Sequence, residues 1–197
     1  MKSLYYFIVK PLNDRYDNTR TIAGTDLIIN SGIEDHRFIS KKAVVVSTPA
    51  AYATKINIGD ELYIHHNIFR RWYDQKGKER NSSTHFKDDL YFVAPEQIYM
   101  YNLKTHLDYC FVKPLKNQSV LENRKEQPNI GIVKYSNSSL EALKITPGTL
   151  ITFTPNSEFE FIIEGERLYC MKSNDIALTH EYQGNEEEYN PSWAKGS

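Results

Sequence analysis

The chain is poor in cysteine, which excludes two ways of stabilising a small fold. Only Cys110 and Cys170 occur in 197 residues, too few for a disulfide framework or a four-ligand zinc site. Both lie in apolar runs, where a free cysteine behaves as a small hydrophobe. We therefore expect two buried thiols.

An excess of one charge and long apolar runs are also missing. The 24 basic and 25 acidic side chains give a net charge of -1, which excludes a wholly basic nucleic-acid-binding protein. No run reaches the roughly 18 apolar residues of a membrane span, and residues 1–15 become charged too early for a signal peptide. The composition predicts a globular cytoplasmic protein with no membrane partner.

The motifs of common catalytic sites are absent as well. The sequence has no G-x-S-x-G elbow and no glycine-rich phosphate loop. His65 and His66 are adjacent, so on a strand they face opposite sides and cannot share one ion. We expect a protein that is not an enzyme, with no catalytic residues, no metal and no cofactor.

What the sequence does contain is an internal repeat. The alignment pairs Ser47 with Ser136 and Gly59 with Gly148. The length differences between the copies fall between the repeated blocks, where loops are expected. Three blocks recur in the same order: residues 5–12 (YYFIVKPL) as residues 108–115 (DYCFVKPL), residues 43–67 as residues 132–156, and residues 90–101 as residues 168–179.

Each copy has a β pattern, with short β-branched runs, alternating apolar residues and glycine-containing turns. Only residues 138–144 suggest a helical turn. The fold class predicted is therefore all-β, with two tandem small β-barrels and little helix. We place the first barrel at residues 1–104, the second at 105–182 and a solvated acidic tail at 183–197.

Together these blocks resemble the GroES-like co-chaperonin family. Residues 10–15 (KPLNDR) fall on the family's Arg-Pro-Leu-x-Asp-Arg start, and residues 59–60 (GD) and 96–98 (EQI) fit its later turn and end. The resemblance covers residues 5–101 and, more faintly, 108–180. It implies small barrels that assemble into a ring, or another homo-oligomer, and cap a GroEL-like chaperonin ring to assist protein folding.

The family docks on its chaperonin through a mobile loop, which here would be residues 16–38. Gly24 followed by the aliphatic triad Leu27, Ile28 and Ile29 falls where the family has its chaperonin-binding residues. Burying each aliphatic side chain is worth roughly 1.5–3 kcal/mol, so a partner or a core must cover them. The alternative is an ordinary edge strand inside the barrel.

A second distinctive segment, residues 68–87, separates the first copy from the second. It mixes cations with aromatic residues, a combination that suits protein interfaces and also single-stranded nucleic acid. Because the whole chain is nearly neutral, we favour a contact with a partner or another subunit over a nucleic-acid groove. The contact residues expected are Phe69, Arg70, Arg71, Trp72 and Tyr73.

Two departures from the family leave an alternative function open. The family's roof hairpin is absent, as in some phage versions, and the second copy has no triad in residues 117–129. The chain could therefore be a phage-encoded co-chaperonin in the host cytoplasm. It could equally be a head, neck or decoration protein that reuses the barrel to contact other proteins of the virion.

Overall fold

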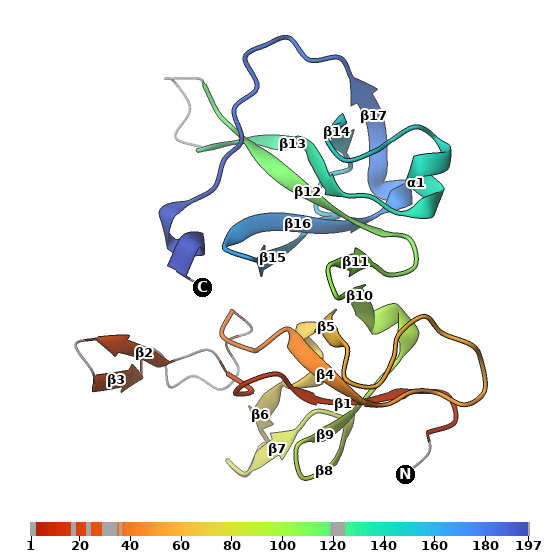
Figure 1. Ribbon diagram of the computed structural model, residues 1–197. Coiled ribbons are helices and arrows are strands. Elements are labelled where there is room, and N and C mark those ends of the chain that lie inside the picture. Colours follow the sequence, from red (N-terminus) through yellow and green to blue (C-terminus); the bar gives the residue numbers. More distant parts are fainter. Residues whose placement is uncertain are drawn as a thin grey trace. The chain divides into compact units, whose positions relative to one another are not determined.

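The computed structural model describes residues 3–16, 19–22, 25–28, 35, 37–118 and 125–196 (Figure 1). The described chain is mostly β with a single short α-helix, which confirms the all-β prediction. It divides into two compact units, residues 1–103 and 104–197. No helix within the described ranges is long and apolar enough to cross a membrane.

The first unit is a sheet in which the strands follow the order β10-β5-β4-β1-β9-β8, with two further hairpins, β2–β3 and β6–β7. Its core packs around Phe7, Val45, Ile64 and Tyr91, all at most 1% exposed. The elements are β1 (Phe7–Pro11), β2 (Thr19–Ile22), β3 (Thr25–Ile28), β4 (Lys42–Ser47), β5 (Glu61–Ile64), η1 (His66–Ile68), β6 (Arg71–Tyr73), β7 (Glu79–Asn81), β8 (His85–Lys87), β9 (Leu90–Val93), η2 (Pro95–Gln97) and β10 (Ile98–Tyr101).

The second unit is a six-stranded sheet of order β15-β16-β12-β13-β14-β17. Its core includes Cys110, Val133, Ile151 and Met171. The elements are β11 (Lys104–Thr105), β12 (Tyr109–Lys116), β13 (Glu126–Tyr135), α1 (Ser138–Ala142), β14 (Leu150–Phe153), β15 (Phe159–Ile163), β16 (Glu166–Lys172), η3 (Ser173–Asp175), β17 (Ile176–His180) and η4 (Ser192–Gly196).

The two sheets have the same strand order, with β12, β13, β14, β16 and β17 in the places of β1, β4, β5, β9 and β10. Their pairing agrees residue by residue: Val9 lies opposite Tyr91 in the first unit, and Val112 lies opposite Tyr169 in the second. Both units also carry a bulge in the same ladder, next to Val9 and next to Val112. Because bulges are specific features of a fold, the duplication extends to the detail of the sheet.

The ladders correct the sequence alignment by one residue in one strand. Val45 pairs with Val9, and Val133 pairs with Val112, so Val45 corresponds to Val133. The alignment of Ser47 with Ser136 would instead have placed Val45 on Lys134. The turn glycines still correspond, because Gly59 N–H donates to Val45 O and Gly148 N–H to Val133 O. The second copy therefore has one additional residue between this strand and its turn.

The expectation of closed barrels is wrong for the part of the chain that the structure describes. A barrel requires a ladder between its first and last strands. In the described residues β8 pairs only with β9 in the first unit, while β15 pairs only with β16 and β17 only with β14 in the second. In the described residues both units are therefore open sheets rather than barrels.

The acidic tail differs from the solvated segment expected. It runs beside the end of β12, where Lys116 N–H donates to Glu187 O (2.8 Å) and Tyr189 N–H donates to Pro114 O (2.9 Å). Glu188 also pairs with Lys113 at 2.8 Å. The tail is thus joined to the end of β12 by one antiparallel bridge, Leu115 to Glu188, and by opposite charges, while the side chains of Glu187 and Glu188 stay exposed.

Candidate functional site

The predicted chaperonin-binding segment contains a hairpin that is separate from the main sheet. Strands β2 and β3 pair with each other as a two-stranded sheet, with Leu27 opposite Arg20 and Ile28 opposite Thr19 (Figure 1). Leu27 and Ile28 are therefore not part of an edge strand of the main sheet. Gly24 and Ile29 lie outside the described residues.

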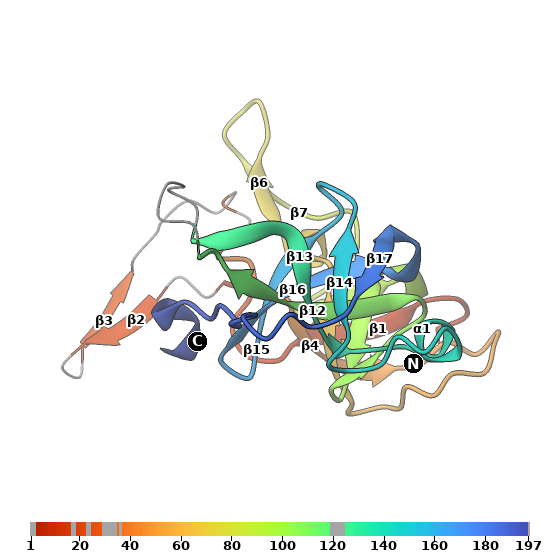
Figure 2. The same cartoon turned by 90° about the horizontal axis from the view of Figure 1, so that it is seen from above.

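The predicted contact segment forms a second hairpin, β6–β7, which projects from the first unit in Figure 2. Trp72 and Tyr73 are 42% and 52% exposed, and Arg70 is exposed as well. Asp74 organises the turn, since its carboxylate accepts hydrogen bonds from the backbone N–H groups of Lys76 and Lys78. The hairpin therefore presents two aromatic rings on a structured turn.

Phe69 differs from the other predicted contact residues. It is fully buried and packs edge-to-face on Tyr91, with 4.9 Å between the ring centroids. A side chain in this position cannot contact a partner, so Phe69 is corrected from a contact residue to part of the hairpin's base. The physical reason is that η1 directs Ile68 and Phe69 into the core before β6 begins.

Arg15, from the family-like KPLNDR segment, ties this hairpin to β1. Its Nη2 donates to Phe69 O at 3.1 Å and to Asn81 Oδ1 at 3.0 Å. Its guanidinium carbon lies 5.2 Å from the centre of the Tyr91 ring, within cation–π range. One side chain thus contacts both ends of the hairpin and the core beneath it.

Arg71 makes a parallel connection through Tyr16. Its backbone N–H donates to the Tyr16 hydroxyl at 2.8 Å, and its guanidinium lies 4.5 Å from the Tyr16 ring centre. Arg71 also pairs with Glu79 across the hairpin at 3.1 Å. Arg71 is therefore half-buried and structural, although the sequence pattern suggested a contact residue.

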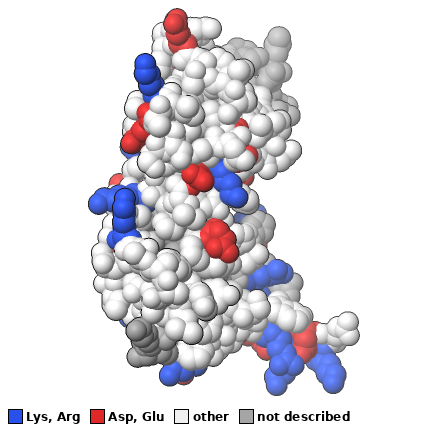
Figure 3. All heavy atoms as spheres, turned by 90° about the vertical axis from the view of Figure 1, so that its right-hand side faces the viewer, with Lys and Arg blue, Asp and Glu red and all other residues white. Residues whose placement is uncertain are grey.

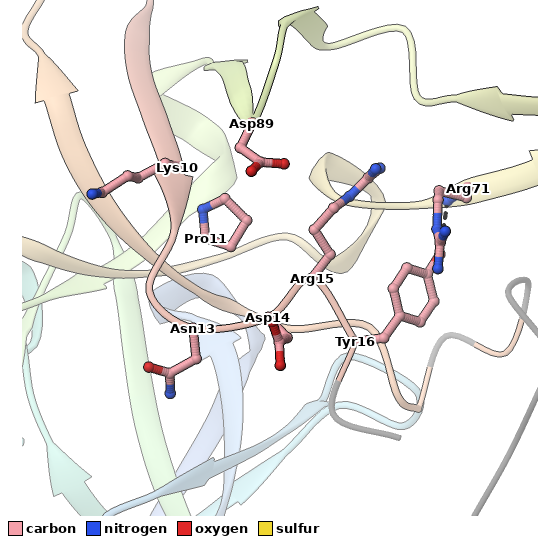
Figure 4. Close-up of a pocket in the computed structure, with 8 residues that line it drawn as sticks. All are labelled: Lys10, Pro11, Asn13, Asp14, Arg15, Tyr16, Arg71 and Asp89. Carbon is pink, nitrogen blue, oxygen red and sulfur yellow. Dashed lines mark hydrogen bonds between the residues drawn. The ribbon is translucent and has the colours of Figure 1, made fainter. Parts of the chain in front are cut away.

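Arg15 and Arg71 line a pocket of about 380 Å³ at the end of β1 (Figure 4). Its lining includes three cations, of which Arg71 is paired with Glu79, and two carboxylates. The other residues of its wall are Lys10, Pro11, Asn13, Asp14, Tyr16 and Asp89. Sequence reasoning placed no site here, because the residues come from three separate segments.

In the second unit the tyrosine that corresponds to Tyr91 has different partners. Tyr169, the counterpart of Tyr91, has the Arg167 guanidinium 4.9 Å from its ring centre. Its hydroxyl donates to Glu126 at 2.8 Å, and Arg167 pairs with Glu126 and Glu160. Burial raises the pKa of Tyr169, and the hydrogen bond to Glu126 raises it further. The aromatic position is shared, but the cation comes from the segment after β1 in the first unit and from β16 in the second.

Cysteine and histidine chemistry adds no further site. Both thiols are buried, as predicted, and burial raises the pKa of Cys110 to about 12. The His65 ring accepts a hydrogen bond from Asn67 N–H and stacks on His66. In the part of the chain that the structure describes, no three His, Cys, Asp or Glu side chains are grouped to hold a metal.

One face of the molecule carries charges of both signs. On the face shown in Figure 3, basic and acidic side chains are interspersed over a mostly uncharged surface.

No family model matches the chain, and no curated protein matches it.

Proposed function

We propose that the protein is a co-chaperonin that binds a GroEL-like chaperonin ring through the β2–β3 segment. The observation that supports this is an asymmetry in a duplicated scaffold. The two sheets agree in strand order and bulges, but β1 and β4 are separated by a segment that contains a hairpin of its own, whereas β12 is followed closely by β13.

A protein that binds its partner through one segment is expected to keep its scaffold and to carry that segment as an addition to it. The segment carries Leu27, Ile28 and Ile29, and its hairpin is not a strand of the main sheet. A short aliphatic segment gives weak docking per chain, because ordering each backbone residue costs about 1–2 kcal/mol. Several copies docking on one ring would add up to strong binding through avidity.

The test is the size of complexes measured by light scattering, with a purified GroEL-like chaperonin and ATP. We expect a nucleotide-dependent complex that the double variant Leu27→Asp, Ile28→Asp abolishes. The matched control is Ile58→Asp, Leu178→Asp, which places the same charges on exposed aliphatic residues, one in the turn before β5 and one in β17. Unchanged chaperonin binding by the first variant would reject the proposal.

The β6–β7 hairpin favours a second candidate, a structural protein of a phage particle. Trp72 and Tyr73 are exposed beside Arg70, and Arg, Trp and Tyr are the usual anchors of protein interfaces. Under this proposal the hairpin is a contact with other virion proteins. A fixed number of copies in purified particles, together with no chaperonin binding, would select this function over the first.

A further inference from the structure

Because the chain is duplicated, the surfaces of the two units can be compared position by position. They differ at one pair of corresponding segments. In the second unit the tail lies along residues 113–116 (KPLK). The corresponding residues of the first unit are 10–13 (KPLN), and they line the pocket of about 380 Å³. The same backbone edge is thus covered in one copy and open in the other.

The hydrogen-bonding groups of the open edge match those of the covered one. Leu12 N–H donates to Lys42 O, so Leu12 faces β4. β1 ends at Pro11 and residues 12–13 form a bend, and both Pro11 and Asn13 line the pocket, with Pro11 O and Asn13 N–H as the backbone groups at this edge. They correspond to Pro114 O and Lys116 N–H, which bond Tyr189 and Glu187. Among the described residues, Asn13 N–H has no hydrogen-bond acceptor.

The side chains of the open edge are also less covered than those of the second unit. The Lys113 side chain is 16% exposed and pairs with Glu188, whereas Lys10 is exposed and makes no ion pair within the described residues. Leu115 is fully buried, whereas Leu12 is only partly buried. These differences are what removal of a covering strand would produce.

We propose that the pocket at residues 10–13 binds an acidic, extended segment of a separate partner polypeptide, which adds as a strand to β1. The backbone of the partner bonds to Pro11 O and Asn13 N–H, in the way that residues 187–189 bond to the second unit. Its carboxylates lie beside Lys10, which makes no ion pair within the described residues, and beside Arg15, whose hydrogen-bond acceptors are uncharged.

The chain's own tail is not the occupant that the structure favours. Glu187 and Glu188 are already paired with Lys116 and Lys113. Asn190 bonds to Gly165 O and Arg167 N–H, and Ala194 is fully buried. A tail from a second copy would first have to leave these contacts, whereas a separate acidic segment loses nothing comparable.

The probe for the test is a fluorescent peptide with the sequence of residues 185–191 (NEEEYNP), titrated into the full chain and followed by anisotropy. We expect salt-sensitive binding that Lys10→Glu weakens by about tenfold or more. Lys55→Glu, an exposed lysine outside the pocket, is the matched control. A peptide with N-methyltyrosine lacks the N–H that would bond Pro11 O, and should also bind about tenfold more weakly.

Three results would overturn the proposal. The first is binding that Lys10→Glu leaves unchanged. The second is binding that is lost only in Lys113→Glu, because the peptide would then be replacing the tail on the second unit. The third is a dimer of the unaltered chain, no binding of the peptide, and loss of the dimer in the Glu187→Lys, Glu188→Lys variant. The open edge would then be filled by the tail of a second copy.

Discussion

Arg15 is the residue whose contacts most directly connect β1 with the β6–β7 hairpin. Replacing it by alanine removes two hydrogen bonds from a charged donor and its contact with Tyr91. We expect Arg15→Ala to lower the free energy of unfolding by about 1.5–3 kcal/mol. Urea denaturation measures this, with exposed Arg70→Ala as a control expected within about 0.5 kcal/mol of the unaltered chain. Equal effects of the two changes would contradict the role of Arg15.

Glu166 makes the stability of the second unit depend on pH. Burial alone would raise the pKa of this carboxyl group, but hydrogen bonds and charges from Lys113 and Lys134 lower it below 4.5. A carboxyl group whose pKa falls on folding stabilises the fold above its ordinary pKa, and this contribution is lost as the pH falls through the lowered value.

The expected result is a smaller acid effect in Glu166→Gln than in the unaltered chain. The midpoint of thermal unfolding, followed by circular dichroism from neutral pH down to below pH 4, should fall less in this variant, because glutamine has no proton to gain. The control Glu141→Gln changes an exposed glutamate of α1 and should keep the full acid effect. Parallel curves for all three proteins would refute the assignment.

At the scale of elements, β12 and β13 approach each other closely at Gly131 of β13. A Cβ added there would overlap with Lys113 O and would lie 2.5 Å from Val112 Cγ1. The corresponding residue of the first unit is Ala43, so the first ladder has room for a Cβ at this position and the second does not. We expect Gly131→Ala to destabilise by about 1–3 kcal/mol through overpacking. Ala43→Gly should cost no more than about 1 kcal/mol, and the reverse order in thermal unfolding would be inconsistent with this packing.

The elements that the sequence predicted are those specified by neighbours in the chain. The turns at Gly59 and Gly148 have φ of +90° and +94°, and the short helix lies within the residues predicted for it. The elements that were missed depend on distant partners. The sequence near Glu187 and Glu188 does not indicate that Lys116 and Lys113 lie opposite them. The tail was therefore predicted to be solvated.

The candidate site shows the same division. The mixed basic and aromatic run predicted a contact surface, and the exposed rings of Trp72 and Tyr73 are compatible with one, but the run has no periodicity that would have indicated the burial of Phe69. The pocket of Arg15 and Arg71 joins residues more than fifty positions apart, and the pairing of strands that creates it was not predictable from either segment. Strand patterns also do not show whether the ends of a sheet meet, which is why barrel closure was wrongly expected.

At the scale of the whole molecule, each unit has its own hydrophobic core. The large cluster around Ile64 contains only residues of the first unit, and those around Phe153 and Leu115 contain only residues of the second. Ile64 and Phe153 occupy corresponding positions and are 0% and 3% exposed. Replacing either by alanine should cost about 2–5 kcal/mol, through lost burial and the cavity left behind.

These costs should be confined to the unit that carries the change. We expect Ile64→Ala to raise amide hydrogen exchange in β1, β4, β5 and β10 while β12, β13 and β14 keep their protection, and Phe153→Ala to do the opposite. Mass spectrometry of peptides from the exchanged full chain measures both sets in one experiment. A rise across all strands in either variant would mean that the duplicated sheets unfold as one cooperative unit, because destabilising one core would then open the other.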